Sequence, residues 1–324
     1  MKIKILPKKT YQKIAAGEVI DRPSSVVREL LDNAIDSEAS VVRVMVADGG
    51  KKLIQITDNG CGMSKKDLQI CYHKHTTSKI SDFEDIYRVV SLGFRGEALN
   101  AISIISELEI TSKTEEDDIG YSVLIREGEL QSEREVVRNT GSTVIVRHLF
   151  HNIPVRQKSL KSDTAEFRQI KEVFIHKAIP FYDRDFHLTH NGKPVYSSLK
   201  SRSPMDRIKL FFGEDLSEHL IEVNQDFDNF HISGFLSSPN FFKPTKKFQS
   251  VYINQRPIFS PSISHAIFSA YEGITPVGQH PLAFLFIQIP PQLMDVNIHP
   301  TKREVKLLNE SAIHQGVYHL IKDA

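Results

Sequence analysis

Apolar residues recur with two different periods in the first part of the chain. Between positions 26 and 35 they return every three to four residues, the stripe of an amphipathic helix, and Pro23 stands just before it, at a typical helix start. Two short runs, 41–46 and 53–56, are rich in apolar residues, several of which alternate with polar ones, and they predict strands. The Asp-Gly-Gly sequence at 48–50 between them predicts a hairpin turn.

The same patterns continue along the rest of the chain. Further strands are expected at 108–111, 121–125, 143–146, 251–253 and 283–289. A helical pattern at 262–271 lies between the last two, which predicts a strand–helix–strand unit. The Ser-rich segment 197–204 resembles a linker. We therefore expect two domains, 1–203 and 204–324, both of the α/β (α+β) class.

Composition narrows the class of protein. The 324 residues are 40% hydrophobic and 25% charged, which excludes a disordered or fibrous chain, and the net charge of +1 excludes a polycationic coat protein. Two cysteines are too few for a disulfide framework. No apolar run approaches the ~20 residues of a membrane span. These features predict a cytoplasmic protein with no membrane partner.

Three polar residues share one side of the first predicted helix. Glu29, Asn33 and Asp36 are four and three residues apart, with Asp32 beside them. A solvated polar face is the simpler interpretation. However, Asn and Asp are poor residues in mid-helix, and so many carboxylates need a compensating cation. Mg²⁺, which prefers hard oxygen ligands, would meet that need.

A glycine-rich turn follows the second predicted strand. Asp58 ends the strand, and Gly60 and Gly62 flank a single residue before Met63, so the backbone can approach a ligand closely. A buried Asp at this point can accept a hydrogen bond from an exocyclic amine. The alternative is an ordinary turn, because Asp-Asn-Gly is favourable turn chemistry.

A second glycine-bearing loop, 91–97, leads into a predicted helix at 98–105. Backbone N–H groups at a helix start, with Arg95 beside them, form a natural phosphate cradle. Upstream, the segment 76–79 (TTSK) adds hydroxyls and a cation. The alternative is a flexible connecting loop. No segment matches a P-loop, because the nearest candidate, 273–280, lacks the lysine.

These pieces, in this order, resemble the GHKL ATPase superfamily and, within it, the N-terminal half of the MutL family of DNA mismatch-repair proteins. The matching stretches cover nearly the whole chain: 14–20 (IAAGEVI), 29–36 (ELLDNAID), 58–63 (DNGCGM), 77–79 (TSK), 93–99 (GFRGEAL), 189–193 (THNGK) and 295–302 (DVNIHPTK).

The resemblance implies roles for individual residues. Glu29 would be the catalytic general base, Asn33 the Mg²⁺ ligand, and Asp58 the partner of the adenine amine, supported by Thr143. Lys302 would reach the γ-phosphate of ATP. The remaining nucleotide contacts implied by the family are Asp36, Gly62, Met63, Thr77, Ser78, Lys79, Leu92, Gly93, Phe94, Arg95 and Gly96, with the span from about 75 to 99 acting as a lid.

The implied fold is a GHKL-type (Bergerat) ATP-binding sandwich followed by a smaller ribosomal-protein-like transducer domain. The implied function is Mg²⁺-dependent ATP hydrolysis that drives N-terminal dimerisation and couples mismatch recognition to downstream repair proteins. No nuclease is expected in this chain, because in the family that activity resides in a further C-terminal half.

Alternatives to this function are another GHKL enzyme, such as a type II topoisomerase subunit or a chaperone, and an adaptor that binds nucleotide without hydrolysing it. Glu29 argues against the adaptor, and the 295–302 stretch argues against the other enzymes. No Lys or Arg lies between Arg256 and Lys302. We therefore expect only weak, sequence-independent binding of DNA.

Overall fold

The computed structural model describes residues 3–79, 92, 96–295, 306–307 and 309–324. Within these residues the chain divides into two compact units. The first contains the described parts of Met1–Lys79 and Ser91–Ile175 together with Asp183–Lys200, and the second contains His176–Tyr182 and the described part of Ser201–Ala324. None of the described helices has both the length and the apolar character needed to cross a membrane.

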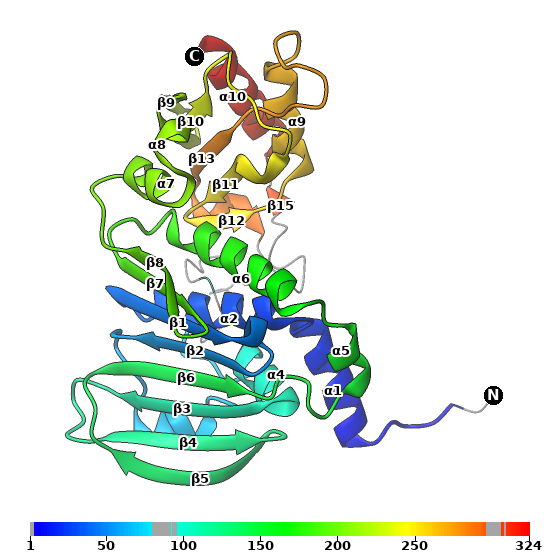
Figure 1. The fold of residues 1–324 in the computed structure, drawn as a ribbon, viewed down its shortest axis with the longest axis vertical. Coiled ribbons are helices and arrows are strands. Elements are labelled where there is room, and N and C mark those ends of the chain that lie inside the picture. Colours follow the sequence, from blue (N-terminus) through cyan, green and yellow to red (C-terminus); the bar gives the residue numbers. More distant parts are fainter. Residues whose placement is uncertain (1–2, 80–91, 93–95, 296–305, 308) are drawn as a thin grey trace. The chain divides into compact units, whose positions relative to one another are not determined.

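An eight-stranded mixed sheet forms the first unit, with the strand order β5-β4-β3-β6-β2-β1-β7-β8 (Figure 1). Its strands are β1 (Val41–Ala47), β2 (Leu53–Asp58), β3 (Glu107–Lys113), β4 (Gly120–Arg126), β5 (Glu129–Val136), β6 (Gly141–Arg147), β7 (Asp185–His190) and β8 (Lys193–Ser198). Within this sheet, β1 and β7 pair in parallel and the other neighbouring strands are antiparallel. The expected β1–β2 hairpin is confirmed, and so are the strands expected near 108, 121 and 143.

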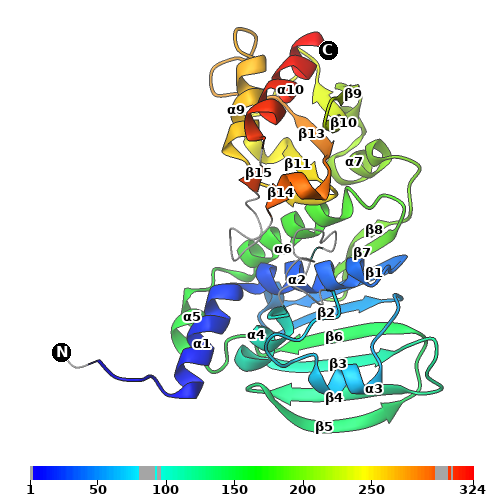
Figure 2. The same ribbon diagram turned by 180° about the vertical axis from the view of Figure 1, so that it is seen from behind.

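Helices lie on one face of this sheet, as Figure 2 shows. The first unit contains α1 (Lys8–Val19), α2 (Pro23–Asp36), α3 (Lys65–Ile70), α4 (Ala98–Ile105) and α5 (Pro154–Ser159), and α6 (Asp163–Ala178) belongs to it as far as Ile175. Side chains on a strand alternate between the two faces. Ile54 and Ile56 of β2 are buried on the helical face, whereas Gln55 and Thr57 are only partly buried on the opposite face.

Helix α2 matches the helix expected from the sequence. Pro23 occupies its first turn, where the missing N–H costs nothing. The apolar stripe is buried, with Leu30 and Leu31 at most 2% exposed. Burying this stripe against β1 and β2 fixes the helix and directs its polar residues toward one side.

The second unit is built on a five-stranded sheet with the order β12-β11-β13-β10-β9. Its elements are α7 (Pro204–Phe212), α8 (Glu214–Ser217), β9 (Leu220–Phe227), β10 (Phe230–Ser237), β11 (Gln249–Ile253), β12 (Arg256–Ile258), α9 (Pro261–Ala270), β13 (Ala283–Gln288), β14 (Met294–Asp295), β15 (Lys306–Leu307) and α10 (Glu310–Asp323). Strands β11 and β13 are parallel with α9 between them in sequence, which confirms the expected strand–helix–strand unit. Helices α9 and α10 pack against each other.

Candidate nucleotide site

The polar side of α2 is in contact with two described residues of the 75–99 segment, Lys79 and Leu92. Lys79 Nζ donates to Asn33 Oδ1 at 3.1 Å and to Asp36 Oδ2 at 2.6 Å. The N–H of Leu92 donates to the other Asp36 oxygen at 2.8 Å. Four of the residues predicted as nucleotide contacts are therefore neighbours in space, although they lie up to 59 positions apart in the printed sequence.

The Lys79 contacts also test whether this place suits a metal cation. Asn33 and Asp36 already hold a positive charge through their side-chain oxygens, and oxygen is the ligand atom that Mg²⁺ prefers. Among the described residues, no group of three or more His, Cys, Asp or Glu forms a ready-made metal cage. That pattern fits Mg²⁺, which commonly binds through one or two protein oxygens together with phosphate and water.

Glu29 lies one helical turn before Asn33, on the same side of α2. Its side chain is largely buried, with 8% of the residue exposed. Few bulk water molecules can reach a carboxylate that is buried to this extent. This is a suitable environment for a group that orients and deprotonates one attacking water molecule.

Asp58 ends β2 and accepts several hydrogen bonds at one oxygen. The backbone N–H groups of Gly60 and Ser142 donate to its Oδ1 at 2.9 and 3.3 Å, and the Ser37 hydroxyl lies 3.4 Å from the same atom. Burial raises the pKa of the Asp58 carboxyl above its usual value, although these donors and Arg138 oppose the shift. Oδ2 remains able to accept a hydrogen bond from a ligand.

The turn after Asp58 is fitted closely to the end of α2. A Cβ on Gly60 would lie 2.4 Å from the Ser37 carbonyl oxygen, so only glycine fits there. The Cys61 N–H donates to that same oxygen at 3.0 Å. This contact links Asp58 mechanically to the helix that carries Glu29 and Asn33.

Gly62 and Met63 are positioned by the neighbouring strands. Gly62 has φ +74°, and a Cβ on it would lie 2.0 Å from the Lys113 carbonyl oxygen. The Met63 N–H donates to Ser112 Oγ at 2.7 Å, and that hydroxyl lies 2.8 Å from Ser142 Oγ. The turn is therefore held against β3 and β6 by a short chain of hydroxyl groups.

Thr143 does not support the Asp58 carboxylate as expected. The β2–β6 register pairs Asp58 with Ser142 and Thr57 with Thr143. Since neighbouring residues on a strand point to opposite faces, Thr143 points away from the helices, where its hydroxyl donates to Thr57 Oγ1 at 3.2 Å. Ser142, which the sequence analysis missed, is the residue beside Asp58. Only the strand register identifies it.

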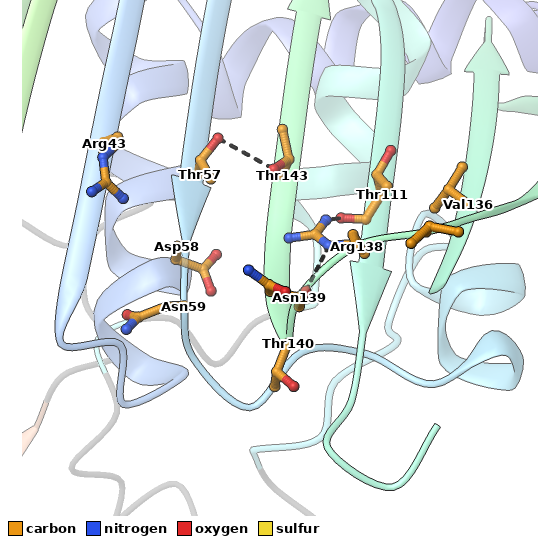
Figure 3. Close-up of a pocket in the computed structure, with 11 residues that line it drawn as sticks. Arg43, Thr57, Asp58, Asn59, Thr111, Val136, Arg138, Asn139, Thr140 and Thr143 are labelled. Carbon is orange, nitrogen blue, oxygen red and sulfur yellow. Dashed lines mark hydrogen bonds between the residues drawn. The ribbon is translucent and has the colours of Figure 1, made fainter. Parts of the chain in front are cut away.

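A cavity of about 410 Å³ opens beside this threonine pair (Figure 3). It is lined by Arg43, Thr57, Asp58, Asn59, Thr111, Val136, Val137, Arg138, Asn139, Thr140 and Thr143. Arg138 is held in place by donating to the carbonyl oxygens of Thr111 and Asn139. The cavity lies on the face of the sheet that carries Thr57 and Thr143, and it reaches Asp58 at the end of β2. Its lining includes neither Glu29 nor Asn33.

The remaining predicted contacts lie at the two ends of the 75–99 segment. Thr77 Oγ1 accepts from the Lys79 N–H at 3.1 Å, and the His75 N–H donates to the Gly96 carbonyl at 3.1 Å. Ser78 is described, but no contact of its side chain contributes to the site. Gly93, Phe94, Arg95 and Lys302 lie outside the described residues, as does most of the 295–302 stretch.

Comparison with known proteins agrees with this geometry. Residues 21–154 match the family described as "Histidine kinase-, DNA gyrase B-, and HSP90-like ATPase", and residues 208–324 match "DNA mismatch repair protein, C-terminal domain". The MutL protein of Flavobacterium johnsoniae is 39% identical over 96% of this chain and 48% of its own length. That of Chlorobium phaeobacteroides is 40% identical over 99% and 51%. The chain belongs to the MutL family.

Solved structures support the same conclusion about the fold. The N-terminal domain of a DNA repair protein has a TM-score of 0.84 at 29% identity, with 96% of both chains covered. The Aquifex aeolicus MutL ATPase domain complexed with ADP has a TM-score of 0.65 at 27% identity and covers 84% of this chain and 94% of its own. The expected GHKL-type mixed α/β fold is confirmed. The chain spans about half the length of the curated MutL relatives it matches.

Proposed function

We propose that this chain binds ATP with Mg²⁺ and hydrolyses it. The observation that carries the proposal is the joining of Asp58, at the end of β2, to the α2 residues Asn33 and Asp36 through Ser37 and Gly60. Asp58 can accept a hydrogen bond from a base amine, and the side-chain oxygens of Asn33 and Asp36 can bind a cation. All three residues thus belong to one rigid part of the first unit. The ADP complex of the related Aquifex domain supports the same ligand class.

The roles follow from the chemistry of each side chain. Asp58 Oδ2 accepts from the adenine amine, while its Oδ1 stays bonded to the Gly60 N–H. Glu29 accepts a proton from the attacking water. Asn33 would hold Mg²⁺, which would offset the charge of the phosphates. Lys79 moves from its carboxylate to a phosphate oxygen, since both are anionic acceptors for an ammonium.

Binding of ADP to an Asp58→Ala variant, measured by calorimetry with Thr143→Val as the matched control, tests this proposal. The structure assigns Thr143 to the opposite face, so its loss should change affinity by less than about threefold. Loss of the Asp58 acceptor should weaken binding at least tenfold, the effect of about 1.4 kcal/mol. Equal affinities in the two variants, with both folded, would remove adenine recognition from Asp58.

We further propose that ATP binding drives dimerisation through this half, and that the dimer acts in mismatch repair in the bacterial cytoplasm with a mismatch-recognition protein and downstream factors. Lys302 would sense the γ-phosphate. Size-exclusion chromatography with and without a non-hydrolysable ATP analogue and Mg²⁺ tests the first step. We expect the protein to elute as a dimer with the analogue and as a monomer without it. The same elution volume in both conditions would contradict the proposal.

Any contact with DNA is proposed to be weak and independent of sequence. The net charge is only +1, and basic groups are local, as at Lys243, whose ammonium lies 4.5 Å from the centre of the Phe241 ring. Each phosphate contact contributes about −0.9 to the slope of log affinity against log salt for duplex DNA. A salt titration with and without the ATP analogue should give a steeper slope with it, because dimerisation doubles the contacts. A slope near zero excludes DNA binding by this half.

A further inference from the structure

Two histidines face each other across the α9–α10 helix pair of the second unit. His265 Nδ1, on α9, lies 3.3 Å from His314 Nε2, on α10. Their rings are inclined by only 26°, with centroids 5.6 Å apart. His265 is exposed and His314 is partly exposed, so an ion in solution can reach both nitrogens.

The separation of these nitrogens matches two ligands of one metal ion. Zn–N bonds of about 2.0–2.1 Å at a tetrahedral angle place the two nitrogens about 3.3–3.4 Å apart. The structure records the pair as a hydrogen bond, in which one ring nitrogen donates and the other accepts. The two nitrogens therefore already point toward a common position, which a cation can occupy in place of the proton.

The surroundings also favour a cation. Helix α9 carries no charged residue, and on α10 the carboxylate of Glu310 lies one turn before His314, on the same side of the helix. Ser269 Oγ, one turn after His265, lies 3.5 Å from the same Nδ1 and adds a hydroxyl oxygen at the edge of the pair.

Buried apolar side chains fix the two helices that carry the rings. Ile263 and Ile267 of α9, and Ile313 and Val317 of α10, are at most 2% exposed, so both helices are anchored by buried apolar side chains. Because the helices are fixed, a ligand that joins the two imidazoles restricts the two side chains and not the backbone.

We propose that His265 and His314 form a binding site for a divalent transition-metal ion of the zinc class, which ties α9 to α10. Imidazole nitrogen is a preferred ligand of Zn²⁺, Cu²⁺ and Ni²⁺. No third His, Cys, Asp or Glu joins the pair in the part of the chain that the structure describes, so water completes the coordination shell. None of its residues is shared with the proposed nucleotide site, whose described residues belong to the first unit.

Calorimetric titration of the metal-free whole chain with Zn²⁺ tests the proposal. We expect one site whose affinity falls at least tenfold in His265→Gln and equally in His314→Gln, since either change leaves a single imidazole. His319→Gln is the matched control, because His319 is exposed on the same helix and contacts the Tyr318 ring instead of a second imidazole. The affinity of this control should stay within about twofold of the unsubstituted chain.

Two results would overturn the proposal: an unchanged Zn²⁺ affinity in both pair variants, or an equal loss in the His319 control. Far-UV circular dichroism verifies that each variant is folded. If a pair variant fails to fold, the ring ¹⁵N resonances of the unsubstituted chain decide the question. Zn²⁺ must then shift the signals of His265 and His314 together and before those of the other histidines, and any other order refutes the site.

Discussion

Replacing Gly62 by Ala tests how the turn after Asp58 is built. An alanine at φ +74° adopts the left-handed conformation, which costs about 1–2 kcal/mol. Its Cβ would also lie 2.0 Å from the Lys113 carbonyl oxygen, and forcing an extra methyl into a packed place costs about 1–3 kcal/mol. The free energy of unfolding should therefore fall by about 2–5 kcal/mol.

The matched control is Gly192→Ala, in the β7–β8 turn. Gly192 has nearly the same φ, +75°, but a Cβ there would meet nothing within 4 Å. This variant pays only the conformational cost of about 1–2 kcal/mol. The difference between the two variants isolates the close approach of the turn to β3.

Urea denaturation followed by far-UV circular dichroism measures both variants, since the chain has no Trp for fluorescence. ADP affinity should fall in Gly62→Ala, because displacing the turn breaks the 2.7 Å bond from the Met63 N–H to Ser112, and it should be unchanged in Gly192→Ala. Equal losses of stability in the two variants would refute the argument, since the contact with Lys113 would then cost nothing.

Three further predictions concern neighbouring groups. Because burial raises the pKa of Asp58, the folded chain binds the proton of this carboxyl more tightly than the unfolded chain does. The free energy of unfolding therefore falls as the pH rises from 3.8, the usual pKa, through the raised pKa of the folded state. Asp58→Asn should therefore be more stable than the unsubstituted chain at pH 7, with the advantage disappearing below pH 3.8 in urea titrations; an advantage independent of pH contradicts this. Lys79→Met removes the cation 2.6 Å from the Asp36 carboxylate, whose side chain is 6% exposed, so the free energy of unfolding should fall by about 1–3 kcal/mol. Added Mg²⁺ should restore part of this loss, as measured by thermal melts. Ser142→Ala should weaken ADP binding about fivefold, the effect of one hydrogen bond, whereas Thr143→Ala should not, and the reverse order in calorimetry would reject the register argument.

Local signals in the sequence were sufficient for part of the fold. Helix α2 and the β1–β2 hairpin follow from residues close in sequence, namely a stripe of period 3.6 and a glycine turn. Strand β5 was not expected, because half of the residues of Glu129–Val136 are charged and most of them are exposed. It lies at the edge of the sheet, where charged side chains discourage pairing with other chains and remove the apolar alternation of a strand.

Part of the candidate site also follows from local sequence, and part depends on tertiary structure. Glu29, Asn33 and Asp36 share a helix, so their common side follows from spacing alone. The contact of Lys79 with Asn33 and Asp36 depends on how a distant loop returns to the helix, and no local pattern contains that information. The exchange of Thr143 for Ser142 depends on strand register, since a shift of one residue reverses the face of every side chain.

Single-turnover hydrolysis of ATP by Glu29→Ala, measured together with ATP binding, tests the central claim most directly. Glu29 acts on water and not on the nucleotide, so the account predicts that hydrolysis falls by about 10²–10⁴-fold while ATP affinity changes by less than about threefold. Hydrolysis at the unsubstituted rate in a folded Glu29→Ala variant would contradict it.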